Sequence, residues 1–267
     1  MGIHLGEGNA RLPATPAIEI DGKLEQLDLT PWLELVKGQS QGFDPPPLRR
    51  IDLQFDRLSW QQLTLERLDL DLEHDRNALT GSVAGQHFEG RIRIPDDLQR
   101  QPIDVKLSRL ELTFDPESYS PSTQQPKAGS SNLDPTQLPA LAMSADLLKV
   151  NQREFGSLQL TTERLPHGLG LQTLAILQPD KTEINAHGHW LNQVPEGHQS
   201  SIEISLKTED LGRLLTDLGY TANVKQAPTK IDASLHWPGT PQEINRKAEQ
   251  ARQLPNLLER VRQSKPE

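Results

Sequence analysis

The chain has 267 residues, enough for one large or two modest domains, and 34% of them are hydrophobic while only 4% are aromatic. A core of this composition is aliphatic and thin. Acidic residues outnumber basic ones by 37 to 28, and the formal charge of −9 argues against a nucleic-acid partner and against electrostatic docking on anionic headgroups. The absence of cysteine excludes disulfides and thiolate metal sites.

The N-terminal residues contain no basic region followed by an apolar one, and no run of about 18 apolar residues occurs in the chain. We therefore expect this sequence to carry neither a signal peptide nor a membrane anchor. Any contact with lipid must then be made by apolar side chains of the folded protein.

Alternation with a period of two is the dominant pattern of the chain. It places apolar side chains on one face of a strand and polar ones on the other, which is typical of antiparallel sheets with one solvated face. We predict an all-β fold, a long curved antiparallel sheet that forms a groove, with a few short helices. The clearest runs are Ile18/Ile20, Ile51/Leu53/Phe55, Leu68/Leu70/Leu72, Ile92/Ile94, Ile103/Val105/Leu107, Leu110/Leu112/Phe114, Leu158/Leu160, Ile202/Ile204/Leu206 and Ile231/Ala233/Leu235/Trp237.

Two short helices are predicted between the strands. Thr30 and Pro31 form an N-cap and a first helical residue that open a helix from Trp32 to Lys37. The second helix runs from Asp210 to Leu218, with leucines spaced along one stripe. In both cases an alternating strand precedes the helix, so strand followed by short helix is the predicted building module.

The alternation changes phase at three similar tetrapeptides, Phe55–Leu58, Leu65–Leu68 and Leu107–Leu110, where apolar residues lie three apart. A β-bulge would insert one residue at each place and bend the sheet. A short turn between two strands is the alternative interpretation.

Four segments follow from these patterns. Residues 1–114 and 137–240 are predicted to be two similar sheet segments. Residues 115–136, rich in Pro, Ser and Gly, form a mobile linker or long loop that is dispensable for folding, and residues 241–267 form a charged helical tail. An internal echo, Ile-x-Ala-x-x-His-Trp, at Ile184–Trp190 and Ile231–Trp237 supports a repeated unit.

Few residue patterns in the chain suggest chemistry. His187 and His189 share one face of a strand and could bind zinc with a third ligand, but a solvent-facing strand is the simpler interpretation. The carboxylates of Asp69, Asp71, Glu73 and Asp75 alternate with leucines and lack the glycine turn of a calcium loop. Trp190 and Trp237 are either interface anchors or the edge of a core. No common catalytic or nucleotide-binding motif is present. We predict no catalytic residue, no metal site and no cofactor.

The segment from Asp210 to Tyr220, a Leu-rich helix ending in Leu-Gly-Tyr, followed by the strand from Ile231 to Gly239 that closes on Trp-Pro-Gly, resembles the C-terminal region of the YhdP-like branch of the AsmA-like family. Weaker matches extend the likeness over residues 1 to about 240. The resemblance implies a non-enzymatic periplasmic groove, anchored in the inner membrane, that carries phospholipid toward the outer membrane. The missing anchor and the charged stretch after Pro241 suggest a truncated or split copy.

On this interpretation the partners are phospholipid acyl chains and envelope membrane proteins. The alternatives are a scaffolding β-domain of the envelope, whose apolar face is filled by its own side chains, and a carbohydrate-active protein, which the low aromatic content disfavours. The residues expected to contact lipid are Ile18, Ile20, Ile51, Leu53, Phe55, Ile92, Ile94, Ile103, Val105, Leu107, Ile202, Ile204, Leu206, Ile231 and Leu235.

Overall fold

The computed structural model describes residues 1–8, 10, 13, 17–28, 47–60, 63–112, 134–193, 195, 197–218 and 226–241. The predicted helix at 32–37, the charged tail after residue 241 and residues 115–133 of the predicted linker lie outside this part. The strands are β1 (Gly2–Leu5), β2 (Ile18–Asp28), β3 (Leu48–Trp60), β4 (Leu63–Asp75), β5 (Ala78–Ala84), β6 (Phe88–Pro95), β7 (Ile103–Leu112), β8 (Leu141–Val150), β9 (Arg153–Leu165), β10 (Gly168–Leu177), β11 (Glu183–Gln193), β12 (Gly197–Thr208) and β13 (Thr229–Pro238); the helices are η1 (Pro135–Gln137) and α2 (Leu211–Asp217).

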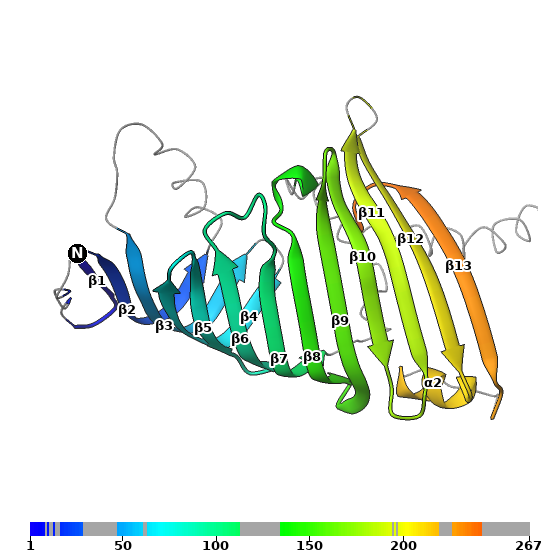
Figure 1. Cartoon of the computed structure of the whole chain (residues 1–267). Coiled ribbons are helices and arrows are strands. Elements are labelled where there is room, and N and C mark those ends of the chain that lie inside the picture. Colours follow the sequence, from blue (N-terminus) through cyan, green and yellow to red (C-terminus); the bar gives the residue numbers. More distant parts are fainter. Residues whose placement is uncertain are drawn as a thin grey trace, which may run out of the picture.

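All 13 strands form one sheet in which neighbours in space are neighbours in sequence, from β1 to β13 (Figure 1). This confirms the prediction of an all-β protein with a curved open sheet. Nine of the 12 strand pairs are antiparallel, but β1/β2, β2/β3 and β7/β8 are parallel. Antiparallel strands can be joined by tight turns, whereas parallel neighbours need a connection that returns to the starting end of the sheet. The ends of β1, β2 and β7 are therefore each joined to the start of the next strand across the length of the strands.

The segment between β7 and β8 therefore does not separate two sheets. Strands β7 and β8 pair directly, from Ile103 opposite Leu141 to Leu112 opposite Val150. Of the predicted linker, the structure describes only its last residues, where Asp134 caps η1 and its carboxylate accepts hydrogen bonds from the backbone and hydroxyl of Thr136. These bonds, led by the one from the hydroxyl, lower the pKa of Asp134.

The predicted helix after β12 is confirmed as α2. Asp210 is its N-cap, and its carboxylate accepts a hydrogen bond from the backbone N–H of Arg213 at 3.0 Å. The apolar stripe faces inward, because Leu214 is buried within the main hydrophobic cluster and Leu218 packs against it. A helix of seven residues is too short to be stable by itself, so α2 depends on the packing of this apolar stripe against the sheet.

The three phase changes have different structural causes. At Leu107–Leu110 the pairing of β6 with β7 shifts between Glu89 and Gly90, so Ser108 is an inserted residue and the bulge prediction is confirmed. In β3 and β4 the prediction of an inserted residue is wrong: Phe55 pairs with Leu68 and Arg57 with Glu66, without any shift in register.

Both strands of this pair change phase at the same level instead. Asp56 of β3 and Arg67 of β4 lie between the pair Phe55/Leu68 and the pair Arg57/Glu66. Arg67 has a left-handed φ of 52°. Because the two strands turn over together, Phe55, Leu58 and Leu68 all stay in the buried cluster. A turn between separate strands is also excluded here, since β3 and β4 each continue through the site.

Gly156 in β9 is a point where the sheet tolerates no side chain. Its φ is +82°, and a Cβ atom there would lie 2.0 Å from the carbonyl oxygen of Leu177. We expect Gly156→Ala to lower the free energy of unfolding by more than the roughly 1 kcal/mol typical of a left-handed residue. Gly197→Ala is the matched control, because Gly197 has φ +78° but nothing within 4 Å of the added atom. Equal losses for both variants in urea unfolding would contradict the steric explanation.

Candidate functional site

One face of the sheet carries two uninterrupted rows of apolar side chains and glycines that cross all 13 strands. The strand registers align the first row, named the Ile20 row, through Ile3, Ile20, Ile51, Leu72, Gly81, Ile92, Val105, Met143, Leu160, Leu174, Ala186, Ile204 and Ala233. The second, the Leu53 row, passes through Leu5, Gly22, Leu53, Leu70, Val83, Gly90, Leu107, Ala145, Leu158, Ile176, Ile184, Leu206 and Ile231.

Glycine occupies positions in these rows where neighbouring backbone comes too close for a side chain. A Cβ atom on Gly81 would lie 1.9 Å from the carbonyl oxygen of Asp71, and one on Gly90 would lie 2.1 Å from that of Lys106. No polar side chain interrupts either row. The two rows and their flanking apolar residues are called the apolar face below.

All fifteen residues predicted to contact lipid lie on the apolar face, as the alternation along each strand requires. Their exposure differs. Leu53, Phe55 and Leu107 are buried, ten others are half-buried, and Ile231 and Leu235 on β13 are each 42% exposed. Contact with lipid itself remains a prediction.

The fifteen predicted residues include none from seven of the strands that build the face, namely β1, β4, β5 and β8 to β11. Leu72, Ala145 and Leu158 are nearly fully buried members of the two rows. The alternation of Leu68, Leu70 and Leu72 carried the signal for β4. In β5 and β8 the signal was weak, because Gly and Ala occupy row positions that larger apolar residues fill elsewhere.

The middle of the apolar face is packed and its C-terminal edge is open. A continuous cluster of buried side chains runs through β3 to β9 and includes Leu53, Phe55, Leu58, Leu68, Val83, Leu107, Ala145, Leu148, Phe155, Leu158 and Leu214. Towards β13 the same rows become accessible to solvent. The face therefore combines a core that stabilises the sheet with an exposed aliphatic strip.

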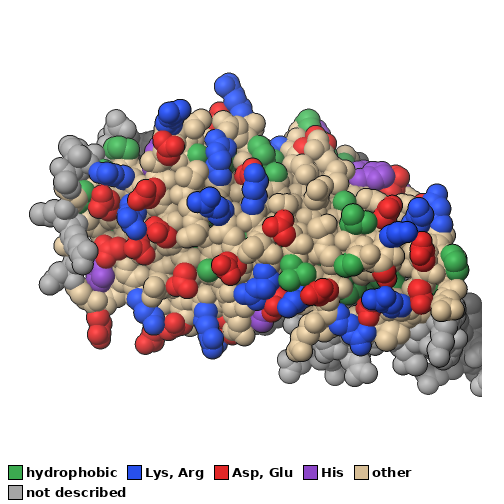
Figure 2. Space-filling model, turned by 60° about the horizontal axis from the view of Figure 1, so that its bottom comes forward, with side chains coloured by type: hydrophobic (Ala, Val, Ile, Leu, Met, Phe, Trp, Pro, Cys, Tyr) green, Lys and Arg blue, Asp and Glu red, His purple; other side chains and the backbone are tan. Residues whose placement is uncertain are grey.

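The opposite face of the sheet is polar and carries compensated charges. Figure 2 shows basic and acidic side chains lying side by side, with few hydrophobic ones among them. Arg50 is shared by three carboxylates, at 3.1 Å from Asp71, 3.3 Å from Glu73 and 3.7 Å from Asp52. This places the predicted carboxylate ladder of β4 on the solvated side. Here Glu111 has a lowered pKa, mainly because Arg109 donates a hydrogen bond to it.

A hollow of about 940 Å³ lies in this polar face across β4 to β7. Its lining combines the short side chains of Thr80 and Ser82 on β5 with longer charged side chains of the neighbouring strands, among them Arg91 and Lys106. Most of the lining residues are polar or charged, and Gly81 and Ile92 of the Ile20 row also border the hollow.

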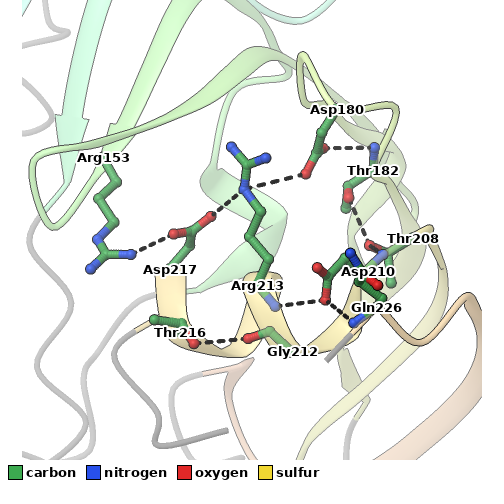
Figure 3. Close-up of polar contacts among 10 residues, drawn as sticks. All are labelled: Arg153, Asp180, Thr182, Thr208, Asp210, Gly212, Arg213, Thr216, Asp217 and Gln226. Atoms are coloured by element: carbon green, nitrogen blue, oxygen red, sulfur yellow. Dashed lines mark hydrogen bonds and ion pairs between the residues drawn. The ribbon is translucent and has the colours of Figure 1, made fainter. Parts of the chain in front are cut away.

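At one end of the strands, α2 is tied to the sheet by ion pairs (Figure 3). Arg153 of β9 donates to Asp217 at 2.5 Å, and Arg213 lies 3.8 Å from both Asp217 and Asp180. The carboxylate of Asp210 also accepts a hydrogen bond from the backbone of Gln226. These contacts hold the polar side of the helix, so that its apolar side covers the end of the apolar face.

The apolar face ends near α2 in buried polar side chains. Thr182 and Thr208 pair through their hydroxyl groups at 2.8 Å, and both are almost fully buried. Gln178 is buried beside them.

At the other end of the strands, the two tryptophans of the internal echo lie at one level, because Ser200 of β12 pairs with both Trp190 and Trp237. Trp237 is buried and donates to the carbonyl of Thr240, so it closes the edge of the core.

The candidate metal ligands have other partners. His187 pairs with Glu203 at 3.2 Å, and His189 is hydrogen-bonded to Ser201 at 2.9 Å, both on the polar face. Among the described residues, no three His, Cys, Asp or Glu side chains converge so as to hold a metal ion. Within the same part of the chain, none of the helices combines the length and apolarity that crossing a bilayer requires.

The fold and this face together define an all-β protein built on one open sheet, apolar on one side and charged on the other. The family model described as YhdP protein matches residues 1–250. The chain therefore belongs to the YhdP family, and membership suggests a role in lipid transport at the bacterial envelope. No curated protein and no solved structure matches the chain.

Proposed function

We propose that this chain is a non-enzymatic segment of a periplasmic lipid-transfer bridge, in which the apolar face carries phospholipid acyl chains between the inner and outer membranes. The partners on this proposal are acyl chains along the sheet and membrane proteins of the envelope at its ends. Membership of the YhdP family supports the proposal.

The observation that carries the proposal is the continuity of the Ile20 and Leu53 rows. An acyl chain binds through apolar contact alone, so a path for it must not cross a polar side chain, whose desolvation costs several kcal/mol. Both rows satisfy this condition through all 13 strands. A sheet that needed only a hydrophobic core could be stabilised by a cluster of apolar side chains on its central strands.

A scaffolding domain with a self-filled face is the second candidate, and one observation favours it. Several side chains of the apolar face, such as Leu72 and Ala145, are nearly inaccessible to solvent without any ligand. The two functions differ at the half-buried residues of the C-terminal strands. A scaffold leaves Ile202, Ile204 and Leu206 in contact with protein or water only, whereas a bridge places lipid on them.

Photo-crosslinking tests this difference on adjacent residues of one strand. A benzophenone amino acid replaces Ile204, on the apolar face, or Ser205, on the polar face; both positions are half-buried. In bacterial cells we expect irradiation to attach phospholipid at position 204 and not at 205, detected by mass spectrometry of the purified chain. Native mass spectrometry of the unmodified chain should show co-purifying phospholipid. Lipid at neither position, or equally at both, would contradict the bridge proposal and leave the scaffold.

A further inference from the structure

Strand β13 leaves an open edge on the sheet. It pairs with β12 through ten consecutive residue pairs, from Thr208 opposite Thr229 to Gln199 opposite Pro238, without a bulge. No described strand pairs with its other edge. Residues 230–236 are all exposed, and they include Ile231 and Leu235 at 42%.

The other end of the sheet is different. Strand β1 has only four residues, so its edge offers little length for another strand to pair with. Natural sheets protect their edges with short strands, bulges, prolines or charges, because unpaired N–H and C=O groups template the addition of a strand. Within β13, Pro238 stands only at the end, and the stretch from Ile231 to Trp237 contains one charged residue, Asp232.

We infer that the edge of β13 pairs with β13 of a second copy of this chain, antiparallel and about a two-fold axis at Ala233. The axis stands perpendicular to the sheet, so the two apolar faces join on the same side. Ile231 then lies opposite the partner's Leu235, and Leu235 opposite the partner's Ile231. The two large side chains that β13 exposes on the apolar face thus cover each other, as an isologous interface requires.

The polar side of β13 is also self-complementary in this register. Lys230 lies opposite the partner's His236, and Asp232 opposite the partner's Ser234, so no like charges meet. Centring the axis on Asp232 would place two carboxylates directly opposite each other, which destabilises a strand pair. A shift by a single residue would set apolar positions against the polar face. The register at Ala233 avoids the repulsion between the two carboxylates and sets the two exposed aliphatic side chains of β13 opposite each other.

In this pairing the partner's β13 adds to the free edge of β13 in the same antiparallel manner in which β12 pairs with its other edge. The Ile20 row passes from Ala233 to the partner's Ala233, and the apolar face extends across the axis. The inference depends on backbone pairing and holds whether or not the face binds lipid. One strand pair buries less area than a standard interface of about 1,600 Å², so we expect reversible association that appears only at high protein concentration.

Disulfide trapping tests both the partner and the register, because the natural chain has no cysteine. In Ala233→Cys the two new thiols lie directly opposite each other, where Cβ atoms are about 5 Å apart and a disulfide forms with small adjustments. Under mild oxidation we expect most of the 267-residue chain to convert from 29.9 kDa to a covalent dimer of twice that mass. Ser234→Cys, on the other face of the same strand, is the control that should stay monomeric.

A mixed experiment fixes the register. Ile231→Cys alone and Leu235→Cys alone should give little dimer, because each thiol faces an isoleucine or leucine of the partner, whereas an equimolar mixture of the two should crosslink. Sedimentation velocity of the unmodified chain should show concentration-dependent dimers that Ile231→Lys abolishes, with unchanged thermal melting. No Ala233→Cys dimer above the Ser234→Cys background, dimers from Ile231→Cys alone, or species larger than dimers would overturn the inference.

Discussion

Replacing Leu53 by Asp is expected to unfold the protein at room temperature or to lower its melting temperature drastically. Leu53 is 8% exposed and sits in the Leu53 row between Gly22 and Leu70. A carboxylate there is buried without a partner, at a cost of several kcal/mol. A typical domain has only about 5–15 kcal/mol of stability in total, so this one substitution removes a large share of it.

The matched control adds the same charge one residue away. Gln54 points to the polar face and is exposed, so Gln54→Asp is expected to change stability by about 0.5 kcal/mol or less, mostly through repulsion from Asp69 opposite it. Circular dichroism during heating and in urea compares the two variants. A Leu53→Asp protein that melts like the control would show that water reaches this position.

Ile204→Asp tests the proposed lipid-binding surface separately from the core. From the sequence, an aspartate at position 53 or 204 is expected to abolish lipid association more than it harms folding. The burial of Leu53 changes that expectation for the first position, while Ile204 is half-buried and its replacement can stay hydrated. Ile204→Asp should therefore melt close to the parent protein and lose bound phospholipid. Ser201→Asp is the control that should keep both, because Ser201 is on the polar face opposite His189 and His236.

Truncating Phe155 to Ala is expected to cost about 3–5 kcal/mol of unfolding free energy, the range for large aromatic side chains removed from cores. Phe155 is 2% exposed and belongs to the cluster that also contains Leu148 and Leu214 of α2. The cavity would lie where the helix meets the sheet, so the variant should also loosen α2. Urea unfolding gives the loss, and hydrogen exchange of the α2 amides reports the loosening.

Leu177→Ala is the control for this truncation. Leu177 is as apolar as the core residues but 53% exposed, so its loss should stay within about 0.5 kcal/mol. A loss of that small size for Phe155→Ala would mean that the cluster beneath α2 does not stabilise the fold.

The variants at Leu53 and Phe155 and the variant at Ile204 test two different parts of the apolar face. The packed middle, from β3 to β9, provides the apolar burial that a single open sheet needs, since no second sheet covers it within the described part of the chain. The C-terminal strands carry the same rows with more exposure. If the proposed function is correct, acyl chains contact the more exposed residues of these strands, such as Ile202, Ile204 and Leu206.

The sequence by itself determined which side chains share a face. Alternation is a property of the strand backbone, so Ile18 and Ile20, or Ile202 and Ile204, point the same way in any sheet that contains them. The sequence also determined α2, because an N-cap at Asp210 and a leucine stripe are local signals. The echo between Ile184–Trp190 and Ile231–Trp237 correctly marked equivalent strands, which lie on either side of β12.

Only the tertiary structure decided how these strands are assembled. The direction of a neighbouring strand depends on how the connection closes, which alternation does not encode, and so the parallel pairing of β7 with β8 was missed. The same holds for the joint phase change at Asp56 and Arg67, which is visible only once the two strands are paired. Burial was likewise decided by the tertiary structure. Leu53 and Leu235 follow the same alternating pattern, but Leu53 is buried and Leu235 is exposed. The difference depends on the curvature of the sheet and on where each residue lies in it.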